Sequence, residues 1–206
     1  MKEDIAERLL NLGAVAVSPS DPFIYTSGKK GPIYCDNRII ISEPEDRKVF
    51  VKAFLQVAQA MDYDVVAGVA TGAVPFAAWI AESTDKPMVY IRGERKAHGK
   101  GKRIEGRLRK GDRVLVIEDL INTGGSSISA CKAVEEAGGE LVACIAIFTY
   151  GRAEEQFRKE GIVLDCLSDF ETLLKKAMEL NMIDDSEYKA LKTWQADPEA
   201  WDETRG

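Results

Sequence analysis

Two acidic residues and a glycine-rich segment follow one another in the middle of the chain. Glu118 and Asp119 come directly after the apolar run 114–117, VLVI, and before the segment 120–127, LINTGGSS. Such a short β-branched run is typical of a strand buried on both faces of a parallel sheet. We expect the acids to end this strand, residues 120–123 to form a loop, and Ser126 or Ser127 to cap a helix that starts after the two glycines.

This order of elements predicts a phosphate site. Ligands of open α/β sheets lie at the carboxyl ends of the strands, where a helix N-terminus offers free amides to a phosphate. The segment lacks the lysine of GxxxxGK[ST], and the chain contains no GxGxxG, which argues against a nucleoside triphosphate or a dinucleotide. Acids beside a phosphate need compensation from sugar hydroxyls, Mg²⁺ or developing positive charge, and a ribose 5-phosphate carrying a pyrophosphate supplies all three. The alternative is an ordinary turn with solvated acids.

The segment VLVIEDLINTGGSS, residues 114–127, resembles the phosphoribosyl pyrophosphate signature of the type I phosphoribosyltransferases. We call it the signature segment. The resemblance implies that Glu118 and Asp119 are catalytic and hold the ribose hydroxyls. It also implies contacts with phosphoribosyl pyrophosphate from Leu120, Ile121, Asn122, Thr123, Gly124, Gly125 and Ser126.

A second glycine loop, ATGAVP at residues 70–75, follows a predicted strand over 64–69 and precedes a predicted helix over 75–82. In the family the matching loop receives the pyrophosphate, so we call it the pyrophosphate loop. Some relatives carry a lysine in this loop, whereas this chain has none. The resemblance therefore implies binding by Thr71, Gly72 and backbone amides, with positive charge supplied from elsewhere.

Residues 92–106 follow a predicted strand over 88–91 and include seven Arg, Lys or His residues and four glycines. A segment of this composition cannot pack a core, and we expect a mobile flap; a solvated charged loop is the alternative. It resembles the RxxxKxHGxG flap of orotate-specific members of the family. That resemblance implies that Arg92, Lys96 and His98 bind phosphoribosyl pyrophosphate, with Lys96 catalytic. A lone histidine in a glycine-rich flap argues against a Ser-His-Asp or Cys-His mechanism.

The stretch 21–38, DPFIYTSGKKGPIYCDNR, has a turn signal between two aromatic-rich runs and predicts a hairpin. Its pattern FxxxSGxxxPxYxDNR resembles the N-terminal hood with which orotate-specific members cover the base, here residues 1–40. Thr26 stands where some relatives carry a lysine. The resemblance implies orotate contacts from Tyr34 and Asn122, and from Arg152, although the local match around Arg152 is poor.

Together these resemblances imply transfer of a 5-phosphoribosyl group from phosphoribosyl pyrophosphate to orotate, giving orotidine 5-monophosphate and pyrophosphate in pyrimidine (UMP) biosynthesis. They also imply Mg²⁺ held mainly by the substrate pyrophosphate rather than by protein ligands, and a homodimer in which the flap is shared between subunits. Two alternatives stay open: a sister transferase acting on a purine or uracil, and a non-catalytic regulator that senses phosphoribosyl pyrophosphate.

Predicted strands and helices alternate along the chain, which favours an α/β fold with a mostly parallel central sheet flanked by helices, in one domain over residues 1–206 with a small N-terminal hood. Further strands are expected over 141–148 and, at a sheet edge, over 162–167. Further helices are expected over 3–12, over 43–61 behind a Ser42 N-cap, over 154–160, from Asp169 or Glu171 to 180, and in the C-terminal tail, whose aromatic residues we expect to pack.

The amino-acid composition argues against several classes of partner and of metal site. The 206 residues are 45% hydrophobic and carry a formal charge of −6, with 28 Lys and Arg against 34 Asp and Glu, which argues against nucleic acid or an anionic membrane as partner. The four cysteines lack CxxC spacing and there is one histidine, so we expect reduced thiols rather than disulfides or a zinc site. No long apolar segment stands at the N-terminus, and a cytoplasmic enzyme is expected.

Overall fold

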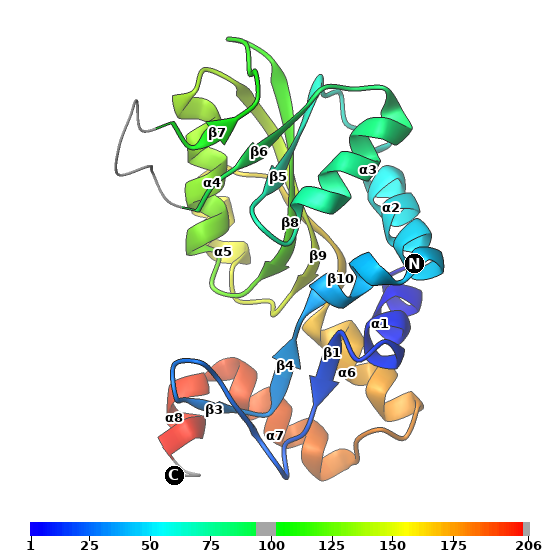
Figure 1. The fold of residues 1–206 in the computed structure, drawn as a ribbon. Helices are drawn as coiled ribbons and strands as arrows, with labels where there is room; N and C mark the ends of the chain where they lie inside the picture. Colours follow the sequence, from blue (N-terminus) through cyan, green and yellow to red (C-terminus); the bar gives the residue numbers. More distant parts are fainter. Residues whose placement is uncertain (94–101, 204–206) are drawn as a thin grey trace.

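The computed structural model describes residues 1–93 and 102–203. Its centre is a six-stranded sheet in the order β10-β9-β8-β5-β6-β7, in which β7 runs antiparallel to β6 and the other neighbours are parallel (Figure 1). The strands of this sheet are β5 Val65–Val69, β6 Met88–Ile91, β7 Ile104–Glu105, β8 Arg113–Ile121, β9 Glu140–Thr149 and β10 Leu164–Asp169. The predicted α/β fold with a mostly parallel sheet is confirmed, as is the edge position of the last strand.

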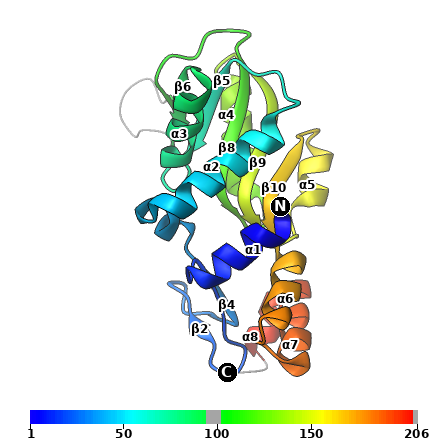
Figure 2. The ribbon, with the colours of Figure 1, turned by 90° about the vertical axis from the view of Figure 1, so that its right-hand side faces the viewer.

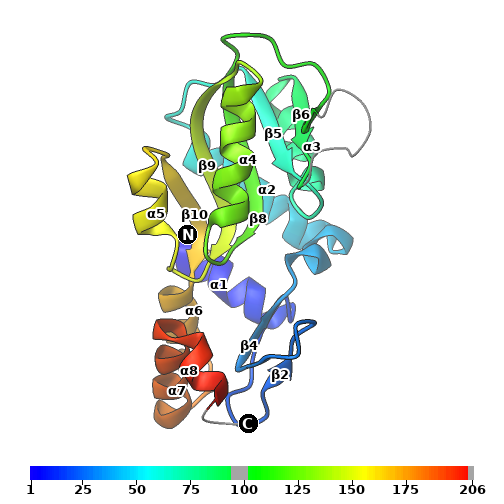
Figure 3. The ribbon, with the colours of Figure 1, turned by 90° about the vertical axis from the view of Figure 1, so that its left-hand side faces the viewer.

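Helices cover both faces of this sheet. Helices α4 and α5 pack on one face (Figure 3), and α2 and α3 pack on the other (Figure 2). The helices are α1 Lys2–Asn11, the short 3-10 helix η1 Asn37–Ser42, α2 Pro44–Ala58, α3 Val74–Thr84, α4 Gly125–Glu136, α5 Glu154–Lys159, α6 Phe170–Glu179, α7 Asp185–Ala196 and α8 Pro198–Glu203. No helix in the described ranges is both long and apolar enough to cross a lipid bilayer.

The central strand β8 is apolar on both faces because both faces are covered. Val114 and Val116 belong to the core cluster under α4 and α5, while Leu115 and Ile117 belong to the cluster under α2 and α3. Successive side chains of a strand point to opposite faces, so every side chain of a strand between two helical layers faces an apolar core. This accounts for the uninterrupted VLVI run.

Three local predictions were wrong. Strand β8 does not end at the acids but continues to Ile121, because β9 runs beside it and Glu118 lies in register with Ala146. Helix α4 starts at Gly125 behind Gly124, whose φ of 86° suits glycine, so neither Ser126 nor Ser127 caps it. Helix α2 starts at Pro44 behind Glu43 rather than behind a Ser42 cap. By contrast, Asp169 caps α6 as predicted, and its side chain accepts a hydrogen bond from the Thr172 amide at 2.9 Å.

The predicted hairpin over 21–38 is only partly right. Strands β2 Phe23–Ile24 and β3 Lys30–Gly31 do pair antiparallel across the turn between them. Strand β4 Ile33–Cys35, however, pairs with β1 Val15–Val17 rather than with β2. The N-terminal region therefore contains two small antiparallel sheets, β1-β4 and β2-β3.

These small sheets and helices α6, α7 and α8 lie together at one end of the molecule, below the main sheet as drawn (Figures 1 and 3). The Lys29 ammonium contacts the Glu199 carboxylate of α8 at 2.8 Å. Trp194 of α7 and Trp201 of α8 are buried, which confirms that the aromatic residues of the tail pack. The C-terminal helices thus pack close to the predicted hood.

Gly68→Ala should destabilise the protein, because α3 approaches β5 closely at Gly68. A Cβ atom there would lie 2.8 Å from the Ala77 Cβ and 3.0 Å from the Val74 Cα, which is backbone and cannot give way easily. We expect a loss of about 1–3 kcal/mol in the free energy of unfolding, measured by urea titration. In the control Gly125→Ala the added Cβ meets nothing within 4 Å, so stability should be unchanged or raised. Equal stabilities of the two variants would contradict this packing.

Candidate active site

The two glycine loops predicted from the sequence meet at the carboxyl ends of β5 and β8. These strands are neighbours in the sheet, yet the chain leaves β5 through α3 towards β6 on one side and leaves β8 through α4 towards β9 on the other. Such a reversal opens a crevice where ligands of α/β sheets bind. A Cβ added to Gly72 would overlap the Asp119 carboxylate, so the pyrophosphate loop packs directly against the signature acid.

The two acids lie in different surroundings. Because β8 continues through them, Glu118 faces the α4 side and Asp119 faces the opposite side. Glu118 is 5% exposed, and its carboxylate accepts hydrogen bonds from the Ser127 hydroxyl at 2.9 Å and from the Asp119 amide at 3.1 Å. Asp119 is partly exposed. Burial, followed by the neighbouring Asp119 carboxylate, raises the pKa of Glu118 to about 8. Asp119 is therefore the acid more available to a ligand.

The loop after β8 ends in a turn that only glycine fits. Gly124 has φ of 86°, and a Cβ there would lie 2.8 Å from the Ala153 Cβ and 3.0 Å from the Phe157 ring. Helix α4 begins at the next residue without a side-chain cap. The first amides of a helix lack partners within the helix and suit a phosphate, so the predicted contacts of residues 120–126 stay a prediction here. Leu120 and Ile121 belong to the strand rather than to the loop.

Asn37 is a site residue that sequence reasoning missed. It lies in η1 directly after β4, is 2% exposed, and its Nδ2 donates a hydrogen bond to the Asp119 backbone carbonyl at 2.6 Å. The predicted hood is thus tied to the signature segment. The triplet DNR was part of the pattern that resembled the hood. No local pattern, however, indicates which of its polar residues is buried, because the partner of Asn37 lies 82 residues away in the sequence.

Two of the three predicted orotate residues come together. The turn at residues 150–153, here the Arg152 turn, follows β9, and the Arg152 Nη2 donates a hydrogen bond to the Asn122 Oδ1. Arg152 is half-buried, its Nε has no acceptor in the described part of the chain, and burial lowers its pKa. No carboxylate among the described side chains, residues 1–93 and 102–201, forms an ion pair with it. Tyr34 is 43% exposed and packs against Phe23 instead, with ring centroids 5.9 Å apart.

The predicted flap is described only at its two ends. Lys96 and His98 lie outside the described residues. The Arg92 amide donates to the Arg103 carbonyl at 2.9 Å, and its guanidinium lies 3.4 Å from the Glu105 carboxylate. The pairing of β6 with β7 therefore brings residues 92 and 103 side by side at the base of this segment.

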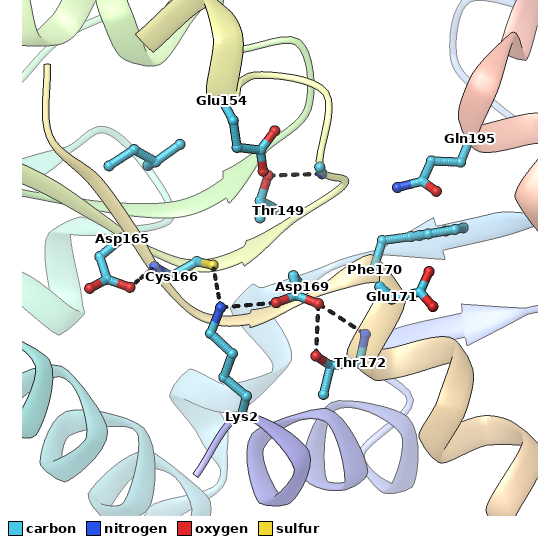
Figure 4. Close-up of a pocket in the computed structure, with 12 residues that line it drawn as sticks. Lys2, Thr149, Glu154, Asp165, Cys166, Asp169, Phe170, Glu171, Thr172 and Gln195 are labelled. Carbon is cyan, nitrogen blue, oxygen red and sulfur yellow. Dashed lines mark hydrogen bonds and ion pairs between the residues drawn. The ribbon is translucent and has the colours of Figure 1, made fainter. Parts of the chain in front are cut away.

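A separate cavity of about 550 Å³ lies beyond the Arg152 turn, and no predicted site residue lines it (Figure 4). Its central cation, the Lys2 ammonium, donates to the Asp169 carboxylate at 2.9 Å and to the Cys166 sulfur at 3.6 Å. Burial raises the pKa of the Cys166 thiol to about 11. Lys2 is therefore paired with Asp169 within this cavity, and none of the residues that line it belongs to either of the two loops.

Glu118 should make stability depend on pH. Its pKa is raised above the ordinary value of about 4.3, so the folded state binds more protons than the unfolded state between about pH 4 and pH 8. The contribution of Glu118 to stability is therefore present at the acidic end of this window and is lost as the pH rises. Glu118→Gln mimics the protonated form and should overtake the wild type in free energy of unfolding towards about pH 8. The free energies of unfolding of both proteins are measured by urea denaturation across this range. A difference between them that does not change with pH would contradict the raised pKa.

Comparison with known proteins identifies the family. The family profile described as "Phosphoribosyl transferase domain" matches residues 52–174. The orotate phosphoribosyltransferase of Coxiella burnetii is 46% identical over 202 residues, which cover 96% of this chain and 97% of that protein.

Solved structures give the same result. The crystal structure of orotate phosphoribosyltransferase from Aeropyrum pernix is similar with a TM-score of 0.76 at 28% identity, covering 87% of this chain and 99% of that one. The Mycobacterium tuberculosis enzyme in complex with 5-phospho-α-D-ribosyl 1-diphosphate is similar with a TM-score of 0.66 at 25% identity. This similarity covers 84% of this chain and 98% of that one. The resemblance found in the sequence is confirmed, and the chain belongs to the orotate phosphoribosyltransferase family of the type I phosphoribosyltransferases.

Proposed function

We propose that the protein carries out the reaction for which its family is named. It transfers the 5-phosphoribosyl group from phosphoribosyl pyrophosphate to orotate, giving orotidine 5-monophosphate and pyrophosphate in pyrimidine biosynthesis. The observation that best supports this function is the packing of Gly72 against Asp119, which joins a glycine loop suited to a pyrophosphate with an acid suited to a ribose. The family membership supports the same reaction.

The sugar is held by the end of β8 and the start of α4. Asp119 binds the ribose hydroxyls and stabilises the positive charge that develops on the ring as the bond to pyrophosphate breaks. Glu118, which the resemblance also assigned to the ribose hydroxyls, lies buried against Ser127 and supports the neighbouring Asp119 from the other face of β8. The amides that follow, up to Ser126, bind the 5-phosphate at the α4 N-terminus. Catalysis is then electrostatic and positional, without a covalent protein nucleophile.

The pyrophosphate lies against Thr71 and Gly72, and its charge is offset by Mg²⁺ and by Arg92, Lys96 and His98. Within the ranges that the structure describes, no three His, Cys, Asp or Glu side chains cluster closely enough to hold a metal ion. We expect an ion held mainly by substrate oxygens and water, as Mg²⁺ commonly is, and Asp119 would be the carboxylate best placed to add a ligand. Such an ion would supply positive charge that offsets the charge on the pyrophosphate leaving group.

Orotate is held between the Arg152 turn and the hood. The Arg152 guanidinium pairs with the orotate carboxylate, since it is a half-buried cation that already holds Asn122 and whose Nε has no acceptor among the described residues. Asn122 contributes an amide, and Tyr34 of the hood, residues 1–40, covers the base. The flap, residues 92–106, closes over the site and excludes water that would hydrolyse the activated sugar. We expect a homodimer with the flap reaching the neighbouring site.

The direct test mixes purified protein with orotate, phosphoribosyl pyrophosphate and Mg²⁺ and follows the loss of orotate absorbance. Uracil and a purine base are assayed in parallel. Faster turnover of either competitor would favour the sister transferase. Absence of turnover with every base, together with a shift of labelled DNA in a gel, would favour the regulator.

Asp119→Asn should lose a few kcal/mol of transition-state stabilisation, a drop in kcat on the order of 10²–10³-fold, because the amide no longer offsets positive charge on the ribose. Steady-state kinetics with both substrates measure it. The control Asp85→Asn changes an acid at the far end of α3 and should leave kcat unchanged. Near-normal activity of Asp119→Asn would contradict the assignment of the ribose.

Lys96→Ala should lower kcat on the order of 10²-fold and change the KM for orotate by less than about threefold, because this cation matters most as the pyrophosphate leaves. The control Lys52→Ala removes an exposed lysine of α2 and should behave like the wild type. An unchanged kcat with a raised KM would show that Lys96 binds substrate without favouring the transition state.

A further inference from the structure

We infer that Trp194, on the C-terminal helix α7, is a positioning residue for the orotate-binding guanidinium of Arg152. The inference rests on the proposed role of Arg152 as the partner of the orotate carboxylate. Helix α7, Asp185–Ala196, lies outside residues 52–174, which the family profile matches. A segment beyond the shared domain would thus complete the base site.

Arg152 lies in a corner formed by two aromatic rings. Its guanidinium carbon is 4.9 Å from the centre of the Trp194 ring and 5.4 Å from that of Tyr150. The two rings meet edge to face, with centroids 5.4 Å apart and an interplanar angle of 75°. Asn122 accepts a hydrogen bond from the Nη2 of the same guanidinium. A cation held over aromatic faces and by one directional hydrogen bond has few orientations left.

Packing alone does not explain a tryptophan at this position. Trp194 is 3% exposed, and its Nε1 is a buried donor that lacks an acceptor in the described part of the chain. A buried donor without a partner destabilises a fold, and a phenyl ring would avoid that cost while still filling most of the space. The indole does offer the best cation-binding face of the aromatic side chains. Its presence is therefore better explained by Arg152 than by the core.

Helix α7 is fixed against the Arg152 turn by its next residue. The Gln195 amide nitrogen donates to the Tyr150 carbonyl at 2.7 Å, and its oxygen accepts from the Lys192 ammonium at 2.9 Å. Figure 4 shows Gln195 extending from α7 towards this turn, which runs between the labelled residues Thr149 and Glu154. The helix thus holds the backbone of the turn through Gln195 and its cationic side chain through Trp194.

The test is a double-mutant cycle read in steady-state kinetics. Arg152→Gln should raise the KM for orotate by about tenfold or more, and Trp194→Phe by about three- to tenfold, each with the KM for phosphoribosyl pyrophosphate within about twofold of the wild type. In the Arg152→Gln background, Trp194→Phe should have no further effect on orotate. The unfolding temperature of Trp194→Phe should be close to that of the wild type, since the unpaired donor is removed.

The matched control is Trp79→Phe on α3. An arginine also lies over its ring, with the Arg47 guanidinium carbon 4.7 Å from the ring centre. The pocket at this place is lined only by residues of α2 and α3, none of which is a proposed site residue. Its KM for orotate should be that of the wild type.

The outcomes separate the two claims. If Arg152→Gln leaves the KM for orotate unchanged, the proposed role of Arg152 is wrong. If Arg152→Gln acts as expected but Trp194→Phe has no effect, adds fully to it in the double variant, or weakens both substrates equally, the positioning role of Trp194 is overturned.

Discussion

The close approach of Gly72 to the Asp119 carboxylate is the constraint on which the rest of the site depends. It exists because β5 and β8 are neighbouring parallel strands, so their carboxyl ends emerge side by side, while their crossover helices leave in opposite directions. A side chain at residue 72 would displace the Asp119 carboxylate from its present position. The fold therefore places the pyrophosphate loop beside the signature acid at one edge of the sheet, and neither loop does so alone.

The continuation of β8 through Glu118 and Asp119 gives two adjacent acids different environments. Alternation along a strand sends one side chain under α4, where Ser127 donates to it, and the other towards the crevice. Burial then favours the neutral form of Glu118. Had the strand ended at the acids, as the sequence suggested, both side chains would have been free to face solvent and to repel each other at the same place.

Local patterns predicted the features that depend on neighbouring residues. The apolar run at 114–117 indicated a strand buried on both faces, the glycines indicated tight turns before α3 and α4, and Asp169 indicated the start of α6. Features that depend on distant residues were missed. The strand extends through two acids because β9 pairs with it, β4 pairs with β1 rather than β2, and Asn37 is buried because it reaches the end of β8. The contact of Trp194 with Arg152 joins helix α7 to the turn after β9, and no sequence pattern indicates that these two segments meet.

The hydrogen bond from Asn37 to the Asp119 carbonyl has a thermodynamic consequence. It links η1, the segment that leaves the N-terminal sheets, to the backbone of the acid at the end of β8. A base that shifts the hood would move Asn37, and a sugar that binds Asp119 would act on its carbonyl. Both ligands would thus affect the same short, buried hydrogen bond. Thermodynamic linkage makes such coupling reciprocal. If the bound sugar changes the affinity for the base by some factor, the bound base changes the affinity for the sugar by the same factor.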